Sequence, residues 1–280
     1  MTLRIALPNK GSLAHSSSEI FKSAGYRQRS DSKDLVILDP VNEVEFYYLR
    51  PRDIATYVGN GELDLGITGR DLLIDSGSDA VELMELEFGS STMRFAAPHG
   101  SPFKSVADLG GKRIATSYPR LVERYLTEAK VQAVLVALDG AIESSISLGV
   151  ADVIADVVAT GSTLRQAGLV PFGDPIVESS AILIQHRGAQ GFDLVVRRLQ
   201  SVVFARQYVI MDYDVSEKDL TSACQVTPGF ESPTISPLQR SGWFAVRAMV
   251  PREKMHRVMD ELYQLGARGI LVTEIHSCRL

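Results

Sequence analysis

Cysteine is scarce in this chain, and its scarcity limits the chemistry to be expected. The two cysteines among 280 residues, Cys224 and Cys278, are too few for a disulfide framework and have no metal-ligand spacing, so we expect two reduced thiols. No apolar run approaches the ~18 residues of a membrane span, and the N-terminus lacks the apolar segment and small-residue cleavage site of a signal peptide. We therefore expect a cytoplasmic protein without a membrane partner.

Positive charge is also in short supply. Lysine and arginine together number 29 against 34 acidic residues, the net charge is −5, and no long basic run occurs. This balance disfavours a grip on nucleic acid through phosphate neutralisation, although it leaves room for a small basic patch around one charged ligand. With 45% hydrophobic and 22% charged residues, general disorder is excluded, and a prior of ~150 residues per domain suggests about two domains.

Short apolar strands alternate with helices through the first two-thirds of the chain. Strands are predicted at 3–8, 35–38, 44–49, 63–68, 95–97, 113–116, 134–138, 153–158 and 180–185, and helices at 13–24, 53–58, 71–75, 121–129, 141–148 and 192–205. This alternation predicts parallel sheets with helices on both faces, in which ligands bind beyond the carboxyl ends of the strands.

The pattern changes after about residue 206. A strand at 208–213, a helix at 217–223, a strand at 244–250, a helix at 252–265 and a strand at 270–275 follow one another. If the proline-rich segment at 227–238 contributes one more short strand, the order is β-α-β-β-α-β, which is typical of a ferredoxin-like domain. A domain boundary is therefore predicted near Gln207.

The strongest local motif is the run Asp152-Val-Ile-Ala-Asp156-Val-Val-Ala-Thr160-Gly161-Ser162-Thr163-Leu164. A buried strand leads into a turn from which a helix can begin, so backbone N–H groups, hydroxyls and a helix N-terminus converge as a phosphate requires. The two upstream acids suit hydroxyls or a magnesium ion. Phosphate, vicinal hydroxyls and metal together describe a phosphoribosyl group. The alternative is an ordinary turn with a capping hydroxyl and a solvated Asp156.

Three other loops at predicted strand ends carry suitable side chains. Lys10 beside Gly11 is suited to a polyphosphate, since glycine lets the backbone approach a ligand closely. Arg50 and Arg52 suit phosphate or carboxylate recognition, and the loop at 69–71 adds an acid, Asp71. Each loop alone is equally compatible with exposed surface residues, but together they indicate one binding edge.

No Ser-His-Asp, Cys-His or paired-histidine arrangement can be assembled from the sequence, and the five histidines are expected at the surface or as caps. Chemistry would then depend on positioning and electrostatics. Transfer of a sugar carbon from pyrophosphate to a nitrogen has these requirements.

Motifs spread over nearly the whole chain point to one family. They lie at 8–12 (PNKGS), 31–34 (DSKD), 49–54 (LRPRDI), 63–71 (LDLGITGRD), 113–119 (RIATSYP), 138–143 (LDGAIE), 152–164 and 227–237 (TPGFESPTISP). With this combination the chain resembles the ATP phosphoribosyltransferases of histidine biosynthesis in their long form, and most of all the actinobacterial version.

The resemblance implies condensation of ATP with 5-phosphoribosyl 1-pyrophosphate (PRPP), in which N1 of the adenine attacks C1 of the ribose and magnesium pyrophosphate leaves. It implies an α/β catalytic part whose two lobes are similar to type II periplasmic binding proteins, with lobe I at 1–90 and 180–206 and lobe II at 91–179. A ferredoxin-like α+β regulatory domain at 207–280 would bind histidine as a feedback inhibitor. The implied cofactor is Mg²⁺, AMP is a further candidate ligand, and the implied assembly is a homo-oligomer, as dimer and hexamer.

Site residues follow from the resemblance motif by motif. The PRPP loop is expected at Asp156, Val157, Ala159, Thr160, Gly161, Ser162 and Thr163. Nucleotide contacts are expected at Lys10, Gly11, Arg50, Asp71 and Tyr118. Lys10, Arg50, Asp152 and Asp156 are the expected catalytic group, Glu143 would steady the site, and Asp152 or Asp156 would meet magnesium, mainly through the substrate.

The inhibitor histidine is expected at Asp214, Phe230, Ser232, Thr234 and Gly269. An acid would meet its ammonium group, and loop groups would meet its carboxylate. Phe230 stands where the family usually has leucine, and Gly269 where it usually has alanine, so the strength of histidine binding stays open.

Three other functions are compatible with parts of the sequence. A solute-binding protein would share the two-lobed architecture, but the missing signal peptide and the phosphate turn argue against it. A purine or pyrimidine salvage phosphoribosyltransferase would share the PRPP loop, yet such enzymes usually have two adjacent acids where Ala155 precedes Asp156. A purely regulatory amino-acid sensor is disfavoured by the intact catalytic loops.

Overall fold

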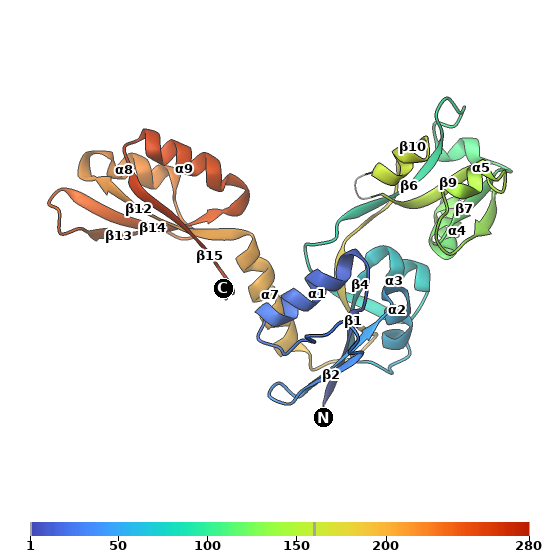
Figure 1. The fold of residues 1–280 in the computed structure, drawn as a ribbon, viewed down its shortest axis with the longest axis horizontal. Coiled ribbons are helices and arrows are strands. Elements are labelled where there is room, and N and C mark those ends of the chain that lie inside the picture. Colours follow the sequence, from blue (N-terminus) through green and yellow to red (C-terminus); the bar gives the residue numbers. More distant parts are fainter. Residues whose placement is uncertain (1, 159–160, 280) are drawn as a thin grey trace. The chain divides into compact units, whose positions relative to one another are not determined.

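The computed structural model describes residues 2–158 and 161–279 (Figure 1). Residues Met1–Glu19 and Tyr26–Gly191 form one compact unit, and Ile20–Gly25 with Phe192–Leu280 form the other. No helix in the described ranges has the length and apolar character that a membrane crossing needs.

The first sheet of unit 1 has six strands in the order β2-β3-β1-β4-β11-β5. Its strands are β1 (Leu3–Pro8), β2 (Val36–Asp39), β3 (Val44–Leu49), β4 (Leu65–Gly69), β5 (Ala80–Glu85) and β11 (Ala181–His186). The helices in this part of the chain are α1 (Ser12–Ser23), α2 (Pro51–Gly59) and α3 (Arg70–Ser76). Because β1 pairs in parallel with both β3 and β4, the loops that follow these three strands leave the same edge.

The second sheet has five strands in the order β10-β6-β9-β7-β8. They are β6 (Ser91–Pro98), β7 (Arg113–Thr116), β8 (Val134–Ala137), β9 (Val153–Val158) and β10 (Leu169–Ser179). The accompanying helices are the 3-10 turn η1 (Val106–Leu109), α4 (Pro119–Glu128), α5 (Ser144–Ser147) and α6 (Ser162–Gln166). The chain enters this sheet after β5 and returns to the first sheet after β10, so the two sheets form two lobes joined by two crossing segments.

The prediction of parallel sheets is wrong in part, because both sheets contain parallel and antiparallel pairs. β11 runs antiparallel between β4 and β5, and β6 runs antiparallel to β9 and β10. The reason lies in the two crossings: a chain that returns to a sheet from another lobe does not need the right-handed helical crossover that enforces parallel pairing.

Unit 2 contains a four-stranded antiparallel sheet in the order β13-β14-β12-β15. Its elements are α7 (Asp193–Arg206), β12 (Tyr208–Ser216), α8 (Glu217–Val226), β13 (Thr234–Pro237), β14 (Trp243–Pro251), η2 (Arg252–Lys254), α9 (Met255–Gln264) and β15 (Arg268–Glu274). Alternate residues of β12, among them Val209 and Met211, are buried against α8 and α9. The order and pairing are those of a ferredoxin-like domain, so the predicted fold class, two α/β lobes followed by a ferredoxin-like α+β domain, is confirmed.

Helix α7 lies in unit 2, whereas the sequence places a boundary near Gln207, after it. The helix continues directly into β12, and the rings of Phe204 and Tyr208 stack with centroids 4.9 Å apart. This packing ties α7 to the ferredoxin-like sheet.

Candidate active site

Three predicted nucleotide contacts follow neighbouring parallel strands at one edge of the first sheet. Lys10 follows β1, Arg50 follows β3, and Asp71 follows β4. Pro8 pairs with Leu49 across the β1–β3 ladder, and the Asn9 N–H donates to the Leu49 carbonyl oxygen at 2.7 Å. Lys10 and Arg50 are exposed. The structure therefore brings two cationic side chains to the end of the sheet where ligands of α/β folds bind.

The loop that carries Lys10 is held in a conformation that needs glycine. Gly11 has φ +83°, a left-handed conformation that other residues adopt at a cost. A guanidinium N–H of Arg29 donates to the Asn9 carbonyl oxygen at 3.1 Å, and Arg29 also lies over the Tyr48 ring at 4.0 Å. These contacts position the backbone next to Lys10.

Asp71 is almost fully buried, with 6% of its surface exposed. The Ser179 hydroxyl donates to Asp71 Oδ1 at 2.6 Å and accepts the Asp71 backbone N–H at 3.0 Å. A side chain at Gly69 would collide with the Asp71 carboxylate, which explains why β4 ends in glycine. Ser179 is the last residue of β10, so the second crossing segment fixes this carboxylate.

Tyr118 and Asp156 of the second lobe face Asp71. Burial is the main cause that raises the pKa of Tyr118 far above its ordinary value, and the Asp71 carboxylate adds to it. Burial also raises the pKa of Asp156 to about 6, with the negative charges of Glu143 and Asp71 as further causes. Tyr118 is therefore a neutral hydroxyl at working pH, and a site with three acids is short of positive charge.

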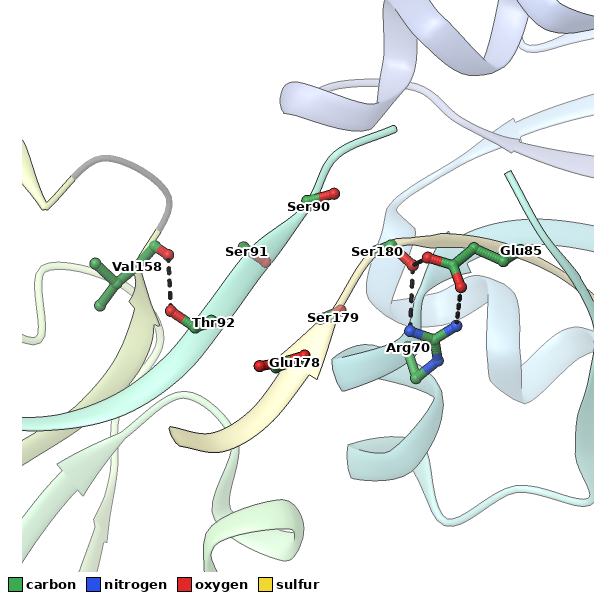
Figure 2. A pocket seen from close by; sticks show the side chains of 9 residues that line it. All are labelled: Arg70, Glu85, Ser90, Ser91, Thr92, Val158, Glu178, Ser179 and Ser180. Atoms are coloured by element: carbon green, nitrogen blue, oxygen red, sulfur yellow. Dashed lines mark hydrogen bonds and ion pairs between the residues drawn. The ribbon is translucent and has the colours of Figure 1, made fainter. Parts of the chain in front are cut away.

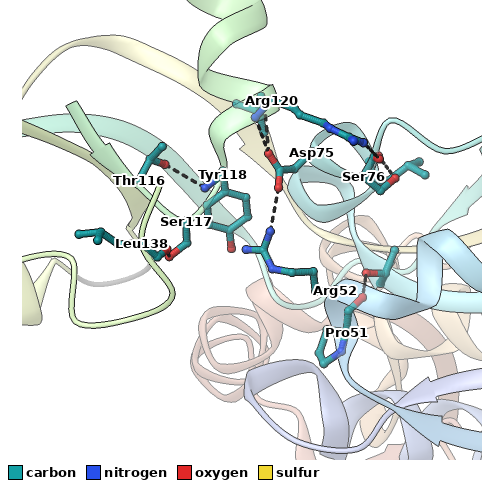
Figure 3. A network of polar contacts seen from close by, with 12 residues as sticks. Pro51, Arg52, Asp75, Ser76, Thr116, Ser117, Tyr118, Arg120 and Leu138 are labelled. Carbon is teal, nitrogen blue, oxygen red and sulfur yellow. Dashed lines mark hydrogen bonds and ion pairs between the residues drawn. The ribbon is translucent and has the colours of Figure 1, made fainter. Parts of the chain in front are cut away.

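One cation meets this group from α2. The Arg52 guanidinium lies 5.0 Å from the centroid of the Tyr118 ring (Figure 3). Together with Lys10 and Arg50 it supplies the positive charge that an anionic ligand of the site would meet.

Asp152 is not part of this group. It precedes β9, ~13 Å from Asp156 at about 3.3 Å per residue, and it forms an ion pair with Arg113 at 2.8 Å. The Arg113 backbone N–H also donates to it, at 2.9 Å. These hydrogen bonds with Arg113 lower the pKa of Asp152 to about 2. The contacts of Asp152 are those of a residue that ties the start of β9 to the start of β7.

We expect Asp152→Asn to lower the free energy of unfolding by at most about 1 kcal/mol at pH 7, because 34% of the Asp152 side chain and 43% of the Arg113 side chain are exposed and water screens the pair. A carboxylate whose pKa is lowered by folding stabilises the protein above its ordinary pKa near 3.8, and this contribution disappears as pH falls toward 2. Urea unfolding at several pH values measures the difference. A variant with unchanged stability at pH 7 would contradict this role for the pair.

The predicted phosphate turn lies partly in the described residues. Gly161 has φ +69° and precedes α6, whose first residues are Ser162 and Thr163, both exposed. The Val157 backbone N–H donates to Asp156 Oδ1 at 2.8 Å. Ala159 and Thr160, which the sequence also assigns to the PRPP loop, lie outside the described residues. The strand, glycine and helix order is as the motif predicts.

A cavity of about 430 Å³ lies where the crossing segments pass between the lobes (Figure 2). Arg70 fixes its wall: the guanidinium donates to Glu82 at 2.8 Å, to Glu85 at 3.1 Å and to the Ser180 hydroxyl at 3.2 Å. The remaining lining is rich in hydroxyls and includes Ser90, Ser91, Thr92, Val158, Glu178 and Ser179. Because Ser179 holds Asp71 and Val158 continues from Asp156, the cavity adjoins the candidate site on both lobes.

Magnesium would have to be held mainly by a ligand. No three histidine, cysteine or acidic side chains within 2–158 and 161–279 are arranged to hold a metal ion. Asp71 is close enough to Asp156 for its charge to contribute to the raised pKa of Asp156. Mg²⁺ typically uses one or two carboxylates together with substrate phosphates, so these residues fit the metal only in combination with a polyphosphate.

Three of the predicted histidine contacts lie around one cavity of the ferredoxin-like domain. Asp214, Thr234 and Gly269 line a cavity of about 450 Å³ on the sheet, beside the Asp212–Arg247 ion pair of 2.7 Å. Phe230 and Ser232 are not among the residues lining it.

Phe230 instead packs edge-on against Phe204 and Tyr208, with centroids 5.6 Å and 6.2 Å away. Ser232 is exposed in the turn after Gly229.

Sequence reasoning missed two residues that shape the site, Ser179 and Asp75. Ser179 ends a strand that proline and glycine disguise, and Asp75 lies in the helix after Asp71 without a motif of its own. Both act through contacts with residues far away in the chain, which no local pattern records.

Comparison with known proteins covers both units. A family model described as ATP phosphoribosyltransferase matches residues 50–203, and one described as HisG, C-terminal domain, matches residues 205–277. The ATP phosphoribosyltransferases of Kocuria rhizophila and Salinispora tropica are 58% and 57% identical to this chain, and each alignment covers 99% of this chain and 100% of the relative.

A solved structure resembles most of this chain. The ATP phosphoribosyl transferase (HisG:HisZ) complex from Thermotoga maritima aligns with a TM-score of 0.62 at 24% identity, over 72% of this chain and 98% of that chain. This likeness bears on the fold.

Proposed function

The chain belongs to the ATP phosphoribosyltransferase family, the enzymes of histidine biosynthesis, and from this premise we propose that it transfers the phosphoribosyl group of PRPP to N1 of ATP. The observation that carries the proposal is the meeting of Asp71, Tyr118 and Asp156 across two lobes, next to a cationic sheet edge. A two-substrate reaction needs such a site, since each lobe can present one substrate to the other.

The chemistry asks little acid–base work of the protein. The bond between ribose C1 and pyrophosphate breaks with its electron pair on the leaving oxygen, and the lone pair of adenine N1 forms the new bond to C1. Because N1 carries no proton, no base is needed at the attacking atom, which agrees with the lack of a histidine in the site. The main task is to stabilise the negative charge that grows on pyrophosphate.

We assign this task to Lys10 and Arg50, which follow β1 and β3 at the carboxyl end of the sheet, and we assign Arg52, which lies over the Tyr118 ring, to the nucleotide. Asp156 would accept hydrogen bonds from the ribose hydroxyls, and the turn at Gly161 to Thr163 would donate to the 5-phosphate. Tyr118 keeps its proton and can donate to Asp71 or to the nucleotide. Magnesium, when bound with PRPP, would add Lewis-acid stabilisation of the pyrophosphate.

We further propose that histidine inhibits by binding the cavity around Asp214, with Thr234 and Gly269 as neighbours. An ammonium group meets a carboxylate there, and Arg247, which lines the same cavity, offers a guanidinium to a carboxylate of the ligand. We also propose that the chain forms homo-oligomers. The exposed apolar side chains at the edge of the first sheet, Val36, Leu38 and Val41, support self-association.

The test of the activity is direct. The protein mixed with ATP, PRPP, Mg²⁺ and a pyrophosphatase is expected to produce the ultraviolet absorbance increase of an N1-alkylated adenine. Gly161→Val should reduce PRPP affinity by about 10²-fold. A β-branched residue is strained at positive φ, and a shift of the backbone N–H donors by about 1 Å is enough for a loss of this size.

Gln166→Ala, an exposed change on the same helix, is the matched control and should behave as the wild type. No absorbance change with the wild type would contradict the proposed activity. An unchanged PRPP affinity in Gly161→Val would place the phosphate elsewhere.

A further inference from the structure

Helix α4 has no cap of its own. Its N-cap residue Tyr118 makes no side-chain cap hydrogen bond, and Pro119 occupies the first turn. The backbone N–H groups of Arg120 and Leu121 instead donate to Oδ1 of Asp75, at 3.0 Å and 3.1 Å. Asp75 belongs to α3 in the other lobe. A carboxylate at a helix N-terminus satisfies orphan donors and complements the helix dipole, so this cap links the lobes energetically.

The second oxygen of the same carboxylate has another partner. Asp75 Oδ2 accepts a hydrogen bond from the Arg52 guanidinium at 2.8 Å, while only 7% of the Asp75 side chain is exposed (Figure 3). One buried carboxylate therefore joins α2, α3 and α4. The Arg52 guanidinium that it orients is the one that lies over the Tyr118 ring.

Neighbouring residues support the same junction. The Arg120 guanidinium donates to the Ser76 carbonyl oxygen. Gly77 ends α3 at φ +61°, and a Cβ there would lie 3.0 Å from the Arg120 guanidinium. Glycine at position 77 therefore leaves room for the Arg120 side chain of the other lobe.

We infer that Asp75 is a positioning residue: by capping α4 from the other lobe, it holds the lobes together at this edge and orients Tyr118 and Arg52 toward the substrates. The inference rests on the proposed function, since it assigns Tyr118 and Arg52 to the nucleotide. Both carboxylate oxygens of Asp75 already accept hydrogen bonds from α4 or Arg52, so Asp75 acts on the substrates through these partners. Tyr118 directly precedes the capped turn, and loss of the cap frees the start of α4 and with it the tyrosine.

Two variants separate the two functions of the carboxylate. Asp75→Asn keeps an oxygen for the α4 amides but loses the charge that holds Arg52, whereas Asp75→Ala loses both. We expect kcat/KM for ATP to fall about 10-fold in Asp75→Asn and about 10²-fold in Asp75→Ala, with KM for PRPP changed far less. Asp75→Ala should also lose the hydrogen-exchange protection of the Arg120 and Leu121 amides, which Asp75→Asn should largely retain.

Two controls lie on α4, the helix that Asp75 caps. Glu128→Gln breaks the exposed Arg124–Glu128 pair and should change nothing, and Val122→Ala should lower stability by removing buried methyl groups without changing the ATP-specific kinetics. If Asp75→Ala behaves as Val122→Ala does in kinetics, or keeps its amide protection, the inference is wrong. If the wild type itself transfers no phosphoribosyl group, the proposed function fails, while the exchange experiment still tests the cap.

Discussion

Asp156→Asn is expected to stabilise the protein at pH 8 while removing most of its activity. Folding raises the pKa of this carboxyl from 3.8 to about 6, mainly because the side chain is buried. At about 1.4 kcal/mol per pKa unit, ionised Asp156 costs the folded state up to ~3 kcal/mol. An amide in the same place has no charge to desolvate, and its oxygen can still accept the Val157 N–H.

The stability difference between Asp156→Asn and wild type should depend on pH. Well below pH 3.8 the carboxyl is protonated in both the folded and the unfolded chain, so wild type and variant should have similar stability there. Between pH 4 and 6 the folded protein binds more protons than the unfolded one, so the wild type loses stability as pH rises. The advantage of Asp156→Asn should therefore grow over this range and level off above pH 6, as urea unfolding at fixed pH values would show.

Activity should change in the opposite direction, with kcat/KM for PRPP falling by about 10²-fold, because the amide removes the charge that would meet the ribose hydroxyls and the metal-bound substrate. Asp152→Asn, at the residue directly before the same strand, is the control. It should lose stability and keep its activity. Equal stability of Asp156→Asn and wild type at pH 8 would show that the ionised carboxylate does not destabilise the folded protein.

The two aspartates also show how far a motif can be interpreted. The sequence pairs Asp152 with Asp156 as two acids before a phosphate turn. Four residues of extended chain keep them apart, and in the structure Asp152 is bound by Arg113 on the neighbouring strand. A motif gives spacing within one element, and the partner that captures a side chain comes from another.

The sequence analysis did not predict β10, and the composition of this strand explains why. β10 contains Pro171, Gly173 and Pro175, which are typical of loops. It lies at the edge of its sheet, and its pairing with β6 shifts between Phe172 and Val177. An edge strand tolerates residues that cannot donate to a ladder, so composition alone hides such a strand.

The buried strands, in contrast, are predictable. β1, β3, β7 and β9 have the predicted bounds, since their apolar runs are bordered by turn residues and buried by helices. The order of strands in a sheet is not local information, and neither is the return of β11. This is why the carboxyl-edge loops could be identified from the sequence, while Ser179 and Asp75 could not.

The second large effect is expected in the ferredoxin-like domain: Asp214→Asn should raise the histidine concentration for half-inhibition by at least about 10-fold. A charge-assisted hydrogen bond between an ammonium and a carboxylate contributes about 1.5–3 kcal/mol, which corresponds to ~10–150-fold in affinity. Asp214 is partly exposed on β12 and lines the cavity. Inhibition curves at fixed ATP and PRPP measure the shift, and the activity without histidine provides the baseline of each variant.

Asp212→Asn tests whether the effect of Asp214→Asn comes from direct contact with histidine or from the loss of any negative charge at the cavity. Asp212 lines the same cavity, but its carboxylate is paired with Arg247, so its loss should leave Arg247 free and weaken inhibition less than the loss of Asp214 does. Gly269→Val tests the space: a Cβ there would lie 3.6 Å from Asp214 Oδ2, and the residue has φ +60°, so a branched side chain both strains the turn and crowds the acid. If Asp214→Asn and Gly269→Val are inhibited as strongly as the wild type, histidine does not bind in this cavity. If histidine weakens substrate binding, the substrates must weaken histidine binding by the same factor. In a variant that has lost this coupling, the substrates should therefore change histidine affinity less than they do in the wild type.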